Sequence, residues 1–213
     1  MKRRRFLFLI GATGGTLATA GLPFGFARML APPASAVELH RRLRPPGALK
    51  DDAAFVAACI DCGLCAEVCP PRCITFYKRD GGDLANTPYI NPEDKACTLC
   101  MKCGIACPTD AIKEIPHAKS EILKQVDMGT AQIDRAACYP WINEGVCGAC
   151  VSVCPLGATA IDNLDISPRP AVKKACVGCG LCVEACPHPS LPIRIVERSN
   201  GTIMQHVDRL QGA

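Results

Sequence analysis

The sequence predicts an α+β fold that is rich in loops, with short edge strands and short helices organised around cysteine side chains. The chain holds 17 cysteines among 213 residues, aromatic residues make up only 5%, and Gly and Pro contribute 18 residues each. This composition argues against a large aromatic core, and a hydrophobic fraction of 49% with 21% charged residues argues against a disordered chain. Cysteine therefore replaces part of the core.

Residues 1–36 form a segment of their own, with five basic residues and no acidic one. Residues 6–27 are uncharged, and small residues follow up to Ala36, which is the layout of an export signal. We expect cleavage after Ala36; an uncleaved anchor is the alternative, because 22 uncharged residues are long enough to span a bilayer. A twin-arginine pattern, which is typical of proteins exported already folded, is formed by Arg3, Arg4, Phe6 and Leu7.

The rest of the chain divides into an extended linker (37–56, with Pro45-Pro46-Gly47), a cysteine-rich body (57–197) and a C-terminal tail (198–213). Beyond the signal, 19 basic residues face 20 acidic ones, which argues against nucleic-acid binding. No phosphate loop, dinucleotide fingerprint or catalytic elbow is present, so we expect neither nucleotide binding nor a substrate-converting site. The signal places the body outside the cytoplasm.

Four copies of one cysteine pattern occupy the body. Three copies read C-x2-C-x2-C-x3-C-P, and in the remaining copy only the first interval grows, from two residues to eight. In chain order the motifs are Cys59, Cys62, Cys65 and Cys69; Cys97, Cys100, Cys103 and Cys107; Cys138, Cys147, Cys150 and Cys154; and Cys176, Cys179, Cys182 and Cys186.

This spacing is typical of 4Fe-4S clusters. Three cysteines at intervals of three residues wrap a turning loop around one face of a cubane, and in two-cluster ferredoxins the fourth cysteine, followed by proline, binds the other cluster. Motifs therefore work in pairs, and four motifs predict two ferredoxin-like modules with four 4Fe-4S clusters. A disulfide framework and structural zinc are the competing interpretations, and the odd cysteine count and the fourfold repeat of one spacing oppose both.

The pairing of the motifs stays open at this point, because neighbouring and nested pairs both satisfy the rule. The first and last motifs read ACIDCGLCAEVCP and ACVGCGLCVEACP, and this similarity favours nesting. In the nested arrangement Cys186 joins the first three cysteines, Cys69 joins the last motif, Cys154 joins the second motif, and Cys107 joins the third.

The segments between the motifs, of 27, 30 and 21 residues, are too short for a separate catalytic domain. Alternation predicts strands at 74–78, before a Gly81-Gly82 turn, and at 193–197, and a helix is expected over 118–126. Cys73 is interpreted as a buried free thiol, with a ligand-exchange or redox role as the alternative. Four scattered histidines (His40, His117, His188 and His206) are interpreted as surface or packing residues, with a weaker hypothesis that His188 tunes a cluster. Trp141 either packs over a cluster or forms a docking tip.

These motifs and their flanks resemble the NapG/MauM family of ferredoxin-type proteins, linked to periplasmic nitrate reduction and methylamine oxidation. Beyond the cysteines, the resemblance rests on the twin-arginine start, the enlarged third motif and three flanking stretches: RLRPPGAL (42–49), Thr87-Pro88-Tyr89 and Met128-Gly129. One departure concerns the second motif, where the family has four residues between its second and third cysteines and this chain has two.

The resemblance implies a periplasmic protein with four 4Fe-4S clusters that works beside an integral-membrane iron-sulfur partner. Together they would form a quinol dehydrogenase that passes electrons to a soluble periplasmic redox protein. Two rival functions remain at this stage: the iron-sulfur subunit of a molybdopterin oxidoreductase, and a cluster-binding maturation factor.

Overall fold

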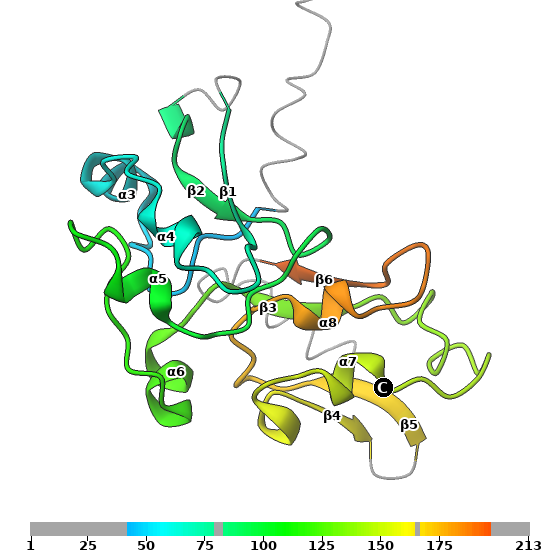
Figure 1. Ribbon diagram of the computed structural model, residues 1–213. Helices are drawn as coiled ribbons and strands as arrows, with labels where there is room; N and C mark the ends of the chain where they lie inside the picture. The colour runs from blue at the N-terminus through cyan, green and yellow to red at the C-terminus, as the bar shows by residue number, and fades with distance from the viewer. Residues whose placement is uncertain (1–41, 79–82, 165–166, 197–213) are drawn as a thin grey trace, which may run out of the picture. The chain divides into compact units, whose positions relative to one another are not determined.

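The computed structural model describes residues 42–78, 83–164 and 167–196 (Figure 1). Contacts divide the chain into residues 1–38 and 39–213, and all described residues belong to the second unit. The predicted export signal with Arg3, Arg4, Phe6 and Leu7, the tail at 198–213 and the Gly81-Gly82 turn lie outside the described residues, as do His40 and His206. Among the described residues, no helix combines the length and apolar character that crossing a membrane requires.

The N-terminal module contains the first two motifs. Its hairpin is formed by β1 (Ile74–Phe76) and β2 (Pro88–Ile90), which pair antiparallel with Ile74 opposite Ile90. Two isolated bridges, Leu43 to Ile90 and Ala48 to Ile112, tie the residues before the first motif to this module. The strand predicted at 74–78 is thereby confirmed in its first three residues.

The expected linker at 37–56 is wrong for its described part. Leu43 is buried, its backbone exchanges two hydrogen bonds with Ile90, and α3 (Asp52–Ala58) begins within the range. Asp51 caps this helix, because its carboxylate accepts the N–H of Ala54 at 2.8 Å. The Pro-Pro-Gly signal correctly marks irregular backbone, but the stretch packs against the module because Leu43 and Phe55 are apolar and fully covered.

Four one-turn helices repeat through the fold, one in each motif. Each contains the third cysteine of its motif and ends two residues before the fourth, because the interval between these two cysteines is the same in all four copies. The helices are α4 (Leu64–Glu67), α5 (Lys102–Ile105), α7 (Ala149–Ser152) and α8 (Leu181–Glu184).

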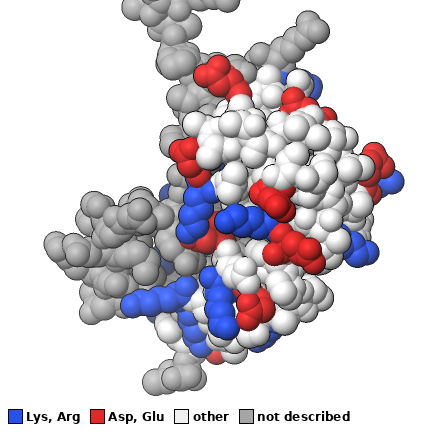
Figure 2. Space-filling view, turned by 90° about the vertical axis from the view of Figure 1, so that its left-hand side faces the viewer, with Lys and Arg blue, Asp and Glu red and all other residues white. Residues whose placement is uncertain are grey.

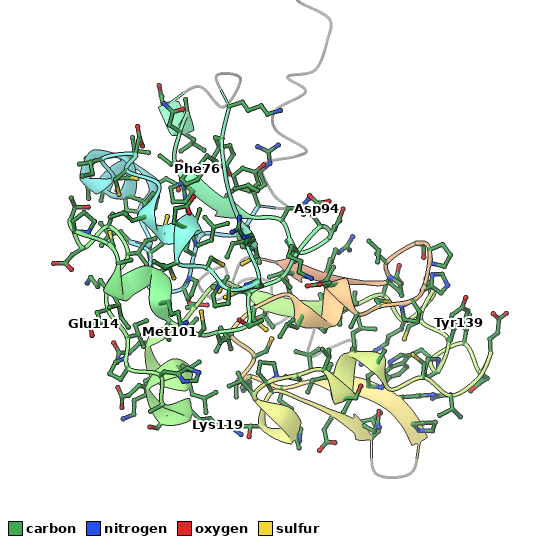
Figure 3. All side chains as sticks on the ribbon, in the orientation of Figure 1. Phe76, Asp94, Met101, Glu114, Lys119 and Tyr139 are labelled. Carbon is green, nitrogen blue, oxygen red and sulfur yellow. The ribbon has the colours of Figure 1, made fainter. Side chains whose placement is uncertain are left out.

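The C-terminal module is closed by the pairing of β3 (Thr130–Ile133) with β6 (Ile193–Val196), which stand before the third motif and after the fourth. A second hairpin, β4 (Ile161–Leu164) with β5 (Ser167–Val172), follows the 3-10 turn η2 (Gly157–Thr159). The strand predicted at 193–197 is confirmed over its described residues. Figure 3 places Phe76 in the first module and Tyr139 at the far end of the second.

The connection between the modules contains α6 (Lys119–Gln125), which confirms the helix expected over 118–126. Ile122 and the C-cap residue Val126 are buried in the core, while Glu121 accepts hydrogen bonds from Lys124 and Gln125 on the exposed side. Lys119 reaches the second module, where its ammonium donates to the carbonyl of Leu156 at 2.8 Å. The core itself is small and consists largely of aliphatic residues and cysteines.

Candidate functional site

The loops that carry the cysteines share an unusual backbone. In three motifs the second and fourth residues after the first cysteine have positive φ: Asp61 and Gly63 (56° and 77°), Leu99 and Met101 (57° and 59°), and Gly178 and Gly180 (76° and 88°). Left-handed residues in a turn aim successive backbone N–H groups into a concavity that attracts anions, and iron-sulfur sites use such concavities. The loops are therefore shaped for a negatively charged group.

Backbone N–H groups also reach the sulfurs directly. Leu99 donates to Cys97 Sγ at 3.4 Å, and Ile112 donates to Cys107 Sγ at 3.5 Å. Ala131, on β3, donates to Cys176 Sγ at 3.4 Å. Such bonds stabilise a thiolate, and hydrogen bonds to the sulfurs are one of the factors that set the reduction potential of a cluster.

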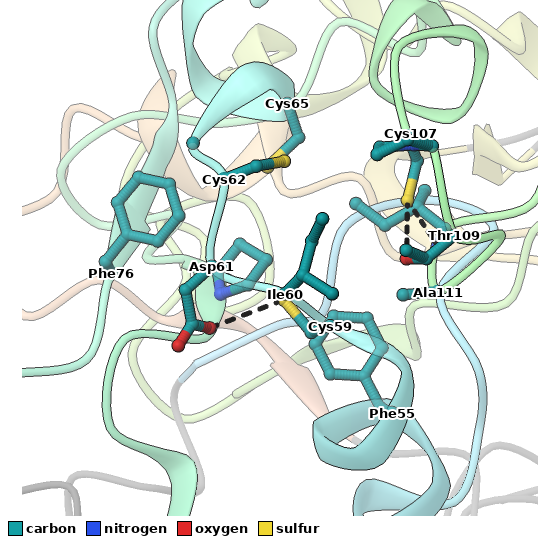
Figure 4. A pocket seen from close by; sticks show the side chains of 14 residues that line it. Phe55, Cys59, Ile60, Asp61, Cys62, Cys65, Phe76, Cys107, Thr109 and Ala111 are labelled. Atoms are coloured by element: carbon teal, nitrogen blue, oxygen red, sulfur yellow. Dashed lines mark hydrogen bonds between the residues drawn. The ribbon is translucent and has the colours of Figure 1, made fainter.

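Site 1 combines the first motif with the last cysteine of the second. One pocket is lined by Phe55, Phe76 and Ile112 together with the four sulfurs of the site (Figure 4), which belong to Cys59, Cys62, Cys65 and Cys107. Burial raises the pKa of Cys107, but backbone N–H groups, that of Ile112 foremost, outweigh it and lower the net value. Burial raises the pKa of Cys65 to about 11.

Site 2 combines the second motif with the last cysteine of the first. Its pocket is lined by Ile74, Ile90 and Met101 and by five sulfurs, those of Cys69, Cys97, Cys100, Cys103 and the additional Cys73. Burial raises the pKa of Cys103 to about 12, and the thiolates of Cys97 and Cys100 add to this effect.

Site 3 combines the fourth motif with the last cysteine of the third. Its pocket is bordered by Ala131, Leu156 and Ile195 and is lined by Cys154, Cys176, Cys179 and Cys182. Burial raises the pKa of Cys179 to about 12, with contributions from the neighbouring thiolates.

Site 4 combines the third motif with the last cysteine of the chain. Burial raises the pKa of Cys150 to about 11, and three neighbouring thiolates contribute, those of Cys138, Cys147 and Cys186. Cys186 contributes in the same way to the raised pKa of Cys138, for which burial is again the largest cause.

The nested pairing favoured by the sequence is therefore wrong. The first three cysteines share their pocket with Cys107 rather than Cys186, and Cys69 stands with the second motif rather than the last. The reason is local: the β1–β2 hairpin folds the chain back after the first motif, so that α4 and α5 lie against each other (Figure 1). The similarity of the first and last motifs reflects a shared loop, since Gly63 and Gly180 take the same left-handed conformation.

The four sites are neighbours in the order 1, 2, 3, 4. The Cys65 thiolate of site 1 contributes, after burial, to the raised pKa of Cys103 in site 2. Cys97 of site 2 acts in the same way on Cys179 of site 3, and Cys150 of site 4 acts on Cys182 of site 3. Each site thus has a neighbouring site within electrostatic reach.

Sites 2 and 3 belong to different modules, and specific hydrogen bonds and an ion pair hold the two together at this junction. The N–H of Cys97 donates to the carbonyl of Cys179 at 3.0 Å, which links two site cysteines through one hydrogen bond. Beside it, Glu184 accepts from the N–H of Ala96 at 2.8 Å and pairs with Lys95 at 2.6 Å. Gly180 allows this approach, because a β-carbon there would meet Pro92 of the first module.

Exposure differs between site 2 and the ends of this series, and in site 3 only Cys179 is buried. Cys69, Cys97 and Cys103 of site 2 are buried, whereas Cys62 of site 1 is exposed. All four cysteines of site 4 are partly exposed. Near site 1 the apolar side chains of Ile60 (61% exposed), Leu64 and Ile105 (65% exposed) reach solvent. Figure 2 shows a largely uncharged area in the upper half of this face, with Asp and Glu side chains along its upper and left edges.

The donor sets fit iron-sulfur clusters. All 17 cysteines are free thiols, and 16 of them gather into the four sets of four. Within the described parts of the chain, no group of three or more His, Cys, Asp or Glu side chains is arranged to hold a single metal ion. A cubane spreads its thiolate ligands over four irons, so they need not converge on one point.

Comparison with known proteins agrees with this geometry. Two segments match the family described as 4Fe-4S dicluster domain, residues 58–111 and residues 145–191. Each match covers two neighbouring motifs, although the second begins after Cys138, whose interval to Cys147 is enlarged. The methylamine utilization ferredoxin-type protein MauM of Paracoccus denitrificans is 35% identical over 76% of this chain and 74% of its own length. The ferredoxin-type protein NapG of Escherichia coli is 33% identical over 96% of this chain and 90% of its own length.

The chain belongs to the NapG/MauM family of ferredoxin-type proteins. The resemblance found in the sequence is thereby confirmed, and with it two 4Fe-4S ferredoxin-type domains and a role in electron transfer. A further relative, the thiosulfate reductase electron transfer subunit PhsB of Salmonella typhi, is 30% identical over 49% of this chain and 54% of its own length.

The stretches that carried the family resemblance have structural roles. Arg42 stacks over the rings of Tyr77 and Tyr89, at 5.0 and 4.6 Å from their centroids. Arg44 covers Phe55 at 4.5 Å and donates to the hydroxyl of Thr87 at 3.0 Å. These cation–π and hydrogen-bond contacts fasten the segment before the first motif onto the β1–β2 hairpin.

Three residues singled out by the sequence have defined surroundings. His188 accepts from the N–H of Ser190 at 3.1 Å and packs against Tyr139, which follows a cysteine of site 4. The guanidinium of Arg135 lies 4.1 Å from the centroid of the Trp141 ring. The indole N–H of Trp141 donates to the carbonyl of Pro170 at 3.2 Å. His117 is exposed, as expected.

Sequence reasoning missed Glu184. It stands two residues after Cys182, on the one-turn helix α8, and its partners Lys95 and Ala96 come from the other module. Glu67 holds the equivalent place in the first motif. Local sequence therefore gives no signal that separates the two glutamates.

Proposed function

We propose that this protein carries one 4Fe-4S cluster in each of the four sites and conducts electrons along the series from site 1 to site 4. The observation that carries this proposal is the order of the sites, with the most buried set of cysteines in site 2 and more accessible ones at the two ends. Carriers that exchange electrons with partners need access at the ends of the series, and exclusion of solvent in the middle favours transfer within the chain.

The clusters supply one-electron carriers when bound, and the protein supplies their spacing and surroundings. The buried thiols lose their protons when they bind iron, so that the binding free energy is coupled to the folding of the loops. The N–H groups of Leu99, Ile112 and Ala131 stabilise the thiolate form of the ligands they contact. Burial and these hydrogen bonds tune the potentials of the individual clusters.

For the cellular role, we propose that the body works in the periplasm after twin-arginine export and accepts electrons from an integral-membrane iron-sulfur quinol dehydrogenase subunit. A periplasmic redox protein would then receive them. The N-terminal pattern and the family membership support this assignment. Because clusters are assembled in the cytoplasm, a chain that carries them requires an export route for folded proteins.

The test is anaerobic affinity purification of the tagged full chain from gently solubilised membranes. We expect an integral-membrane iron-sulfur protein to be recovered with it. In the membranes before solubilisation, we expect the chain to be reduced when a quinol analogue is added. The matched control is Arg3→Lys/Arg4→Lys, which should hold the chain in the cytoplasm with its iron still bound. A chain that stays oxidised beside its membrane partner would instead indicate a maturation factor.

A second candidate is the iron-sulfur subunit of a molybdopterin oxidoreductase. The similarity to a thiosulfate reductase electron transfer subunit favours it, although that match covers half of this chain. Recovery of a large molybdopterin-binding subunit in the same purification would establish this candidate and overturn the quinol route.

A further inference from the structure

Site 2 differs from the other three sites in holding a fifth thiol. Cys73 is 3% exposed, and its Sγ lies 3.5 Å from Sγ of Cys69. It lines the same pocket as the four cysteines of the site and is hydrogen-bonded to Cys97. The extra sulfur is therefore part of the site and not an isolated buried residue.

A tight turn holds Cys73 in this position. The N–H of Arg72 donates to the carbonyl of Cys69 at 3.0 Å, and Arg72 takes the left-handed conformation with φ of 52°. The chain thereby reverses its direction before Cys73, and β1 begins directly after Cys73, at Ile74. Strand pairing on one side and the turn on the other fix the backbone on both sides of the thiol.

The equivalent turn in the second motif provides a natural comparison. Asp110 stands three residues after Cys107 and is also left-handed, with φ of 56°. The next residue, in the place of Cys73, is Ala111, which is buried and lines the pocket of site 1. Sites 1 and 2 thus share one backbone arrangement, with a methyl group in one and a thiol in the other.

We propose that Cys73 is a reserve ligand of the cluster in site 2, and that it takes over the iron bound by Cys69 when that bond is lost. The exchange breaks one iron–sulfur bond and forms another. The proton of the Cys73 thiol passes to the Cys69 sulfur 3.5 Å away, or to solvent when residue 69 has no sulfur, and no electron is gained or lost. The inference rests on the proposed function only in requiring that site 2 holds a cluster.

The experiment compares matched variants of the full chain, purified anaerobically. Cys69→Ala should keep the iron and acid-labile sulfide of the wild type, with a changed electron paramagnetic resonance signal for one cluster. Cys107→Ala has no such reserve, because the residue four positions later is Ala111. This variant should lose the cluster of site 1, with a fall in iron of up to about a quarter. Cys69→Ala/Cys73→Ala should show a loss of the same size at site 2.

A gain-of-function variant keeps the test decisive if Cys69→Ala does not fold. Cys107→Ala/Ala111→Cys places a thiol at the equivalent position of site 1, and we expect it to recover the iron lost by Cys107→Ala. Mapping of alkylated thiols by mass spectrometry adds a second readout: Cys73 should be protected in folded Cys69→Ala.

Two results would overturn the proposal: equal loss of iron in Cys69→Ala and Cys107→Ala, or ready alkylation of Cys73 in a folded Cys69→Ala chain. Failure of the proposed function would look different, because the wild type itself would then lack four clusters.

Discussion

Leu99 and Met101 in the N-terminal module stand where Gly178 and Gly180 stand in the C-terminal module, and all four residues are left-handed. Glycine takes this conformation without strain, whereas for another residue the conformation is unfavourable by roughly 1–2 kcal/mol. Leu99 and Met101 are each 2% exposed, and full burial of such side chains contributes about 1.5–3 kcal/mol. Burial therefore offsets the strain, and one loop geometry arises from two different kinds of residue.

The two solutions have different consequences for packing. The loop of site 2 contributes large side chains to the core of its own module. The loop of site 3, without side chains at these two positions, lies close to other segments: Gly178 packs against the backbone of Gly129, and Gly180 packs against the ring of Pro92. The glycines of the C-terminal module thus allow neighbouring segments to pack closely against the loop, whereas Leu99 and Met101 of the N-terminal module add buried apolar surface. The following predictions test this contrast and the pairing of motifs within each module.

The largest effect is expected from Cys186→Ser, which tests whether pairing stays within the C-terminal module. One cluster should be lost, with iron falling by about a quarter. Because Cys186 stands with the third motif, the thiols newly open to alkylation should be Cys138, Cys147 and Cys150. Alkylation of Cys59, Cys62 and Cys65 instead would show that the nested pairing is correct.

A smaller effect is expected from alanine at the equivalent glycines of the first and last motifs. Gly63→Ala should lower the free energy of unfolding by about 1–2 kcal/mol, because a β-carbon is disfavoured at its φ of 77°. No atom lies within 4 Å of that β-carbon, so no steric clash is added. Gly180→Ala should cost about 1–3 kcal/mol more, because Pro92 occupies the space. The temperature at which visible absorbance is lost under anaerobic heating measures the difference. Equal shifts in the two variants would show that the approach to Pro92 is not tight.

The next contrast concerns the bonds between the modules, where Lys95→Ala should have the smallest effect of all. Glu184→Ala removes the acceptor of the Ala96 N–H, and hydrogen bonds to charged groups contribute about 1.5–3 kcal/mol. Lys95→Ala removes only a half-exposed ion pair, which contributes at most about 1 kcal/mol. Hydrogen exchange at the Ala96 amide should therefore accelerate more in Glu184→Ala than in Lys95→Ala. The reverse order would mean that the ion pair, and not the amide bond, holds this junction.

The sequence predicted the motifs, their family and the short elements around them, because these depend on local spacing. The strands that begin at Ile74 and Ile193 and the helix α6 follow from alternation and periodicity over a few residues. The same local information misled on pairing: similar residues in the first and last motifs report a shared loop and not shared ligands.

Other features depend on contacts between distant segments and could not be predicted. Leu43 is buried because Ile90 pairs with it, which the Pro-Pro-Gly signal nearby does not reveal. The place of Cys73 in site 2 depends on the turn at Arg72, which has none of the glycine or asparagine that marks most left-handed positions. Glu184 acquires its role only because the two modules meet.

The most direct test of four cluster sites is a count of iron, acid-labile sulfide and zinc per chain in protein purified without oxygen. Four occupied sites predict about 16 irons and about 16 sulfides per chain, with no stoichiometric zinc. Stoichiometric zinc, or iron and sulfide for two clusters or fewer, would contradict the account.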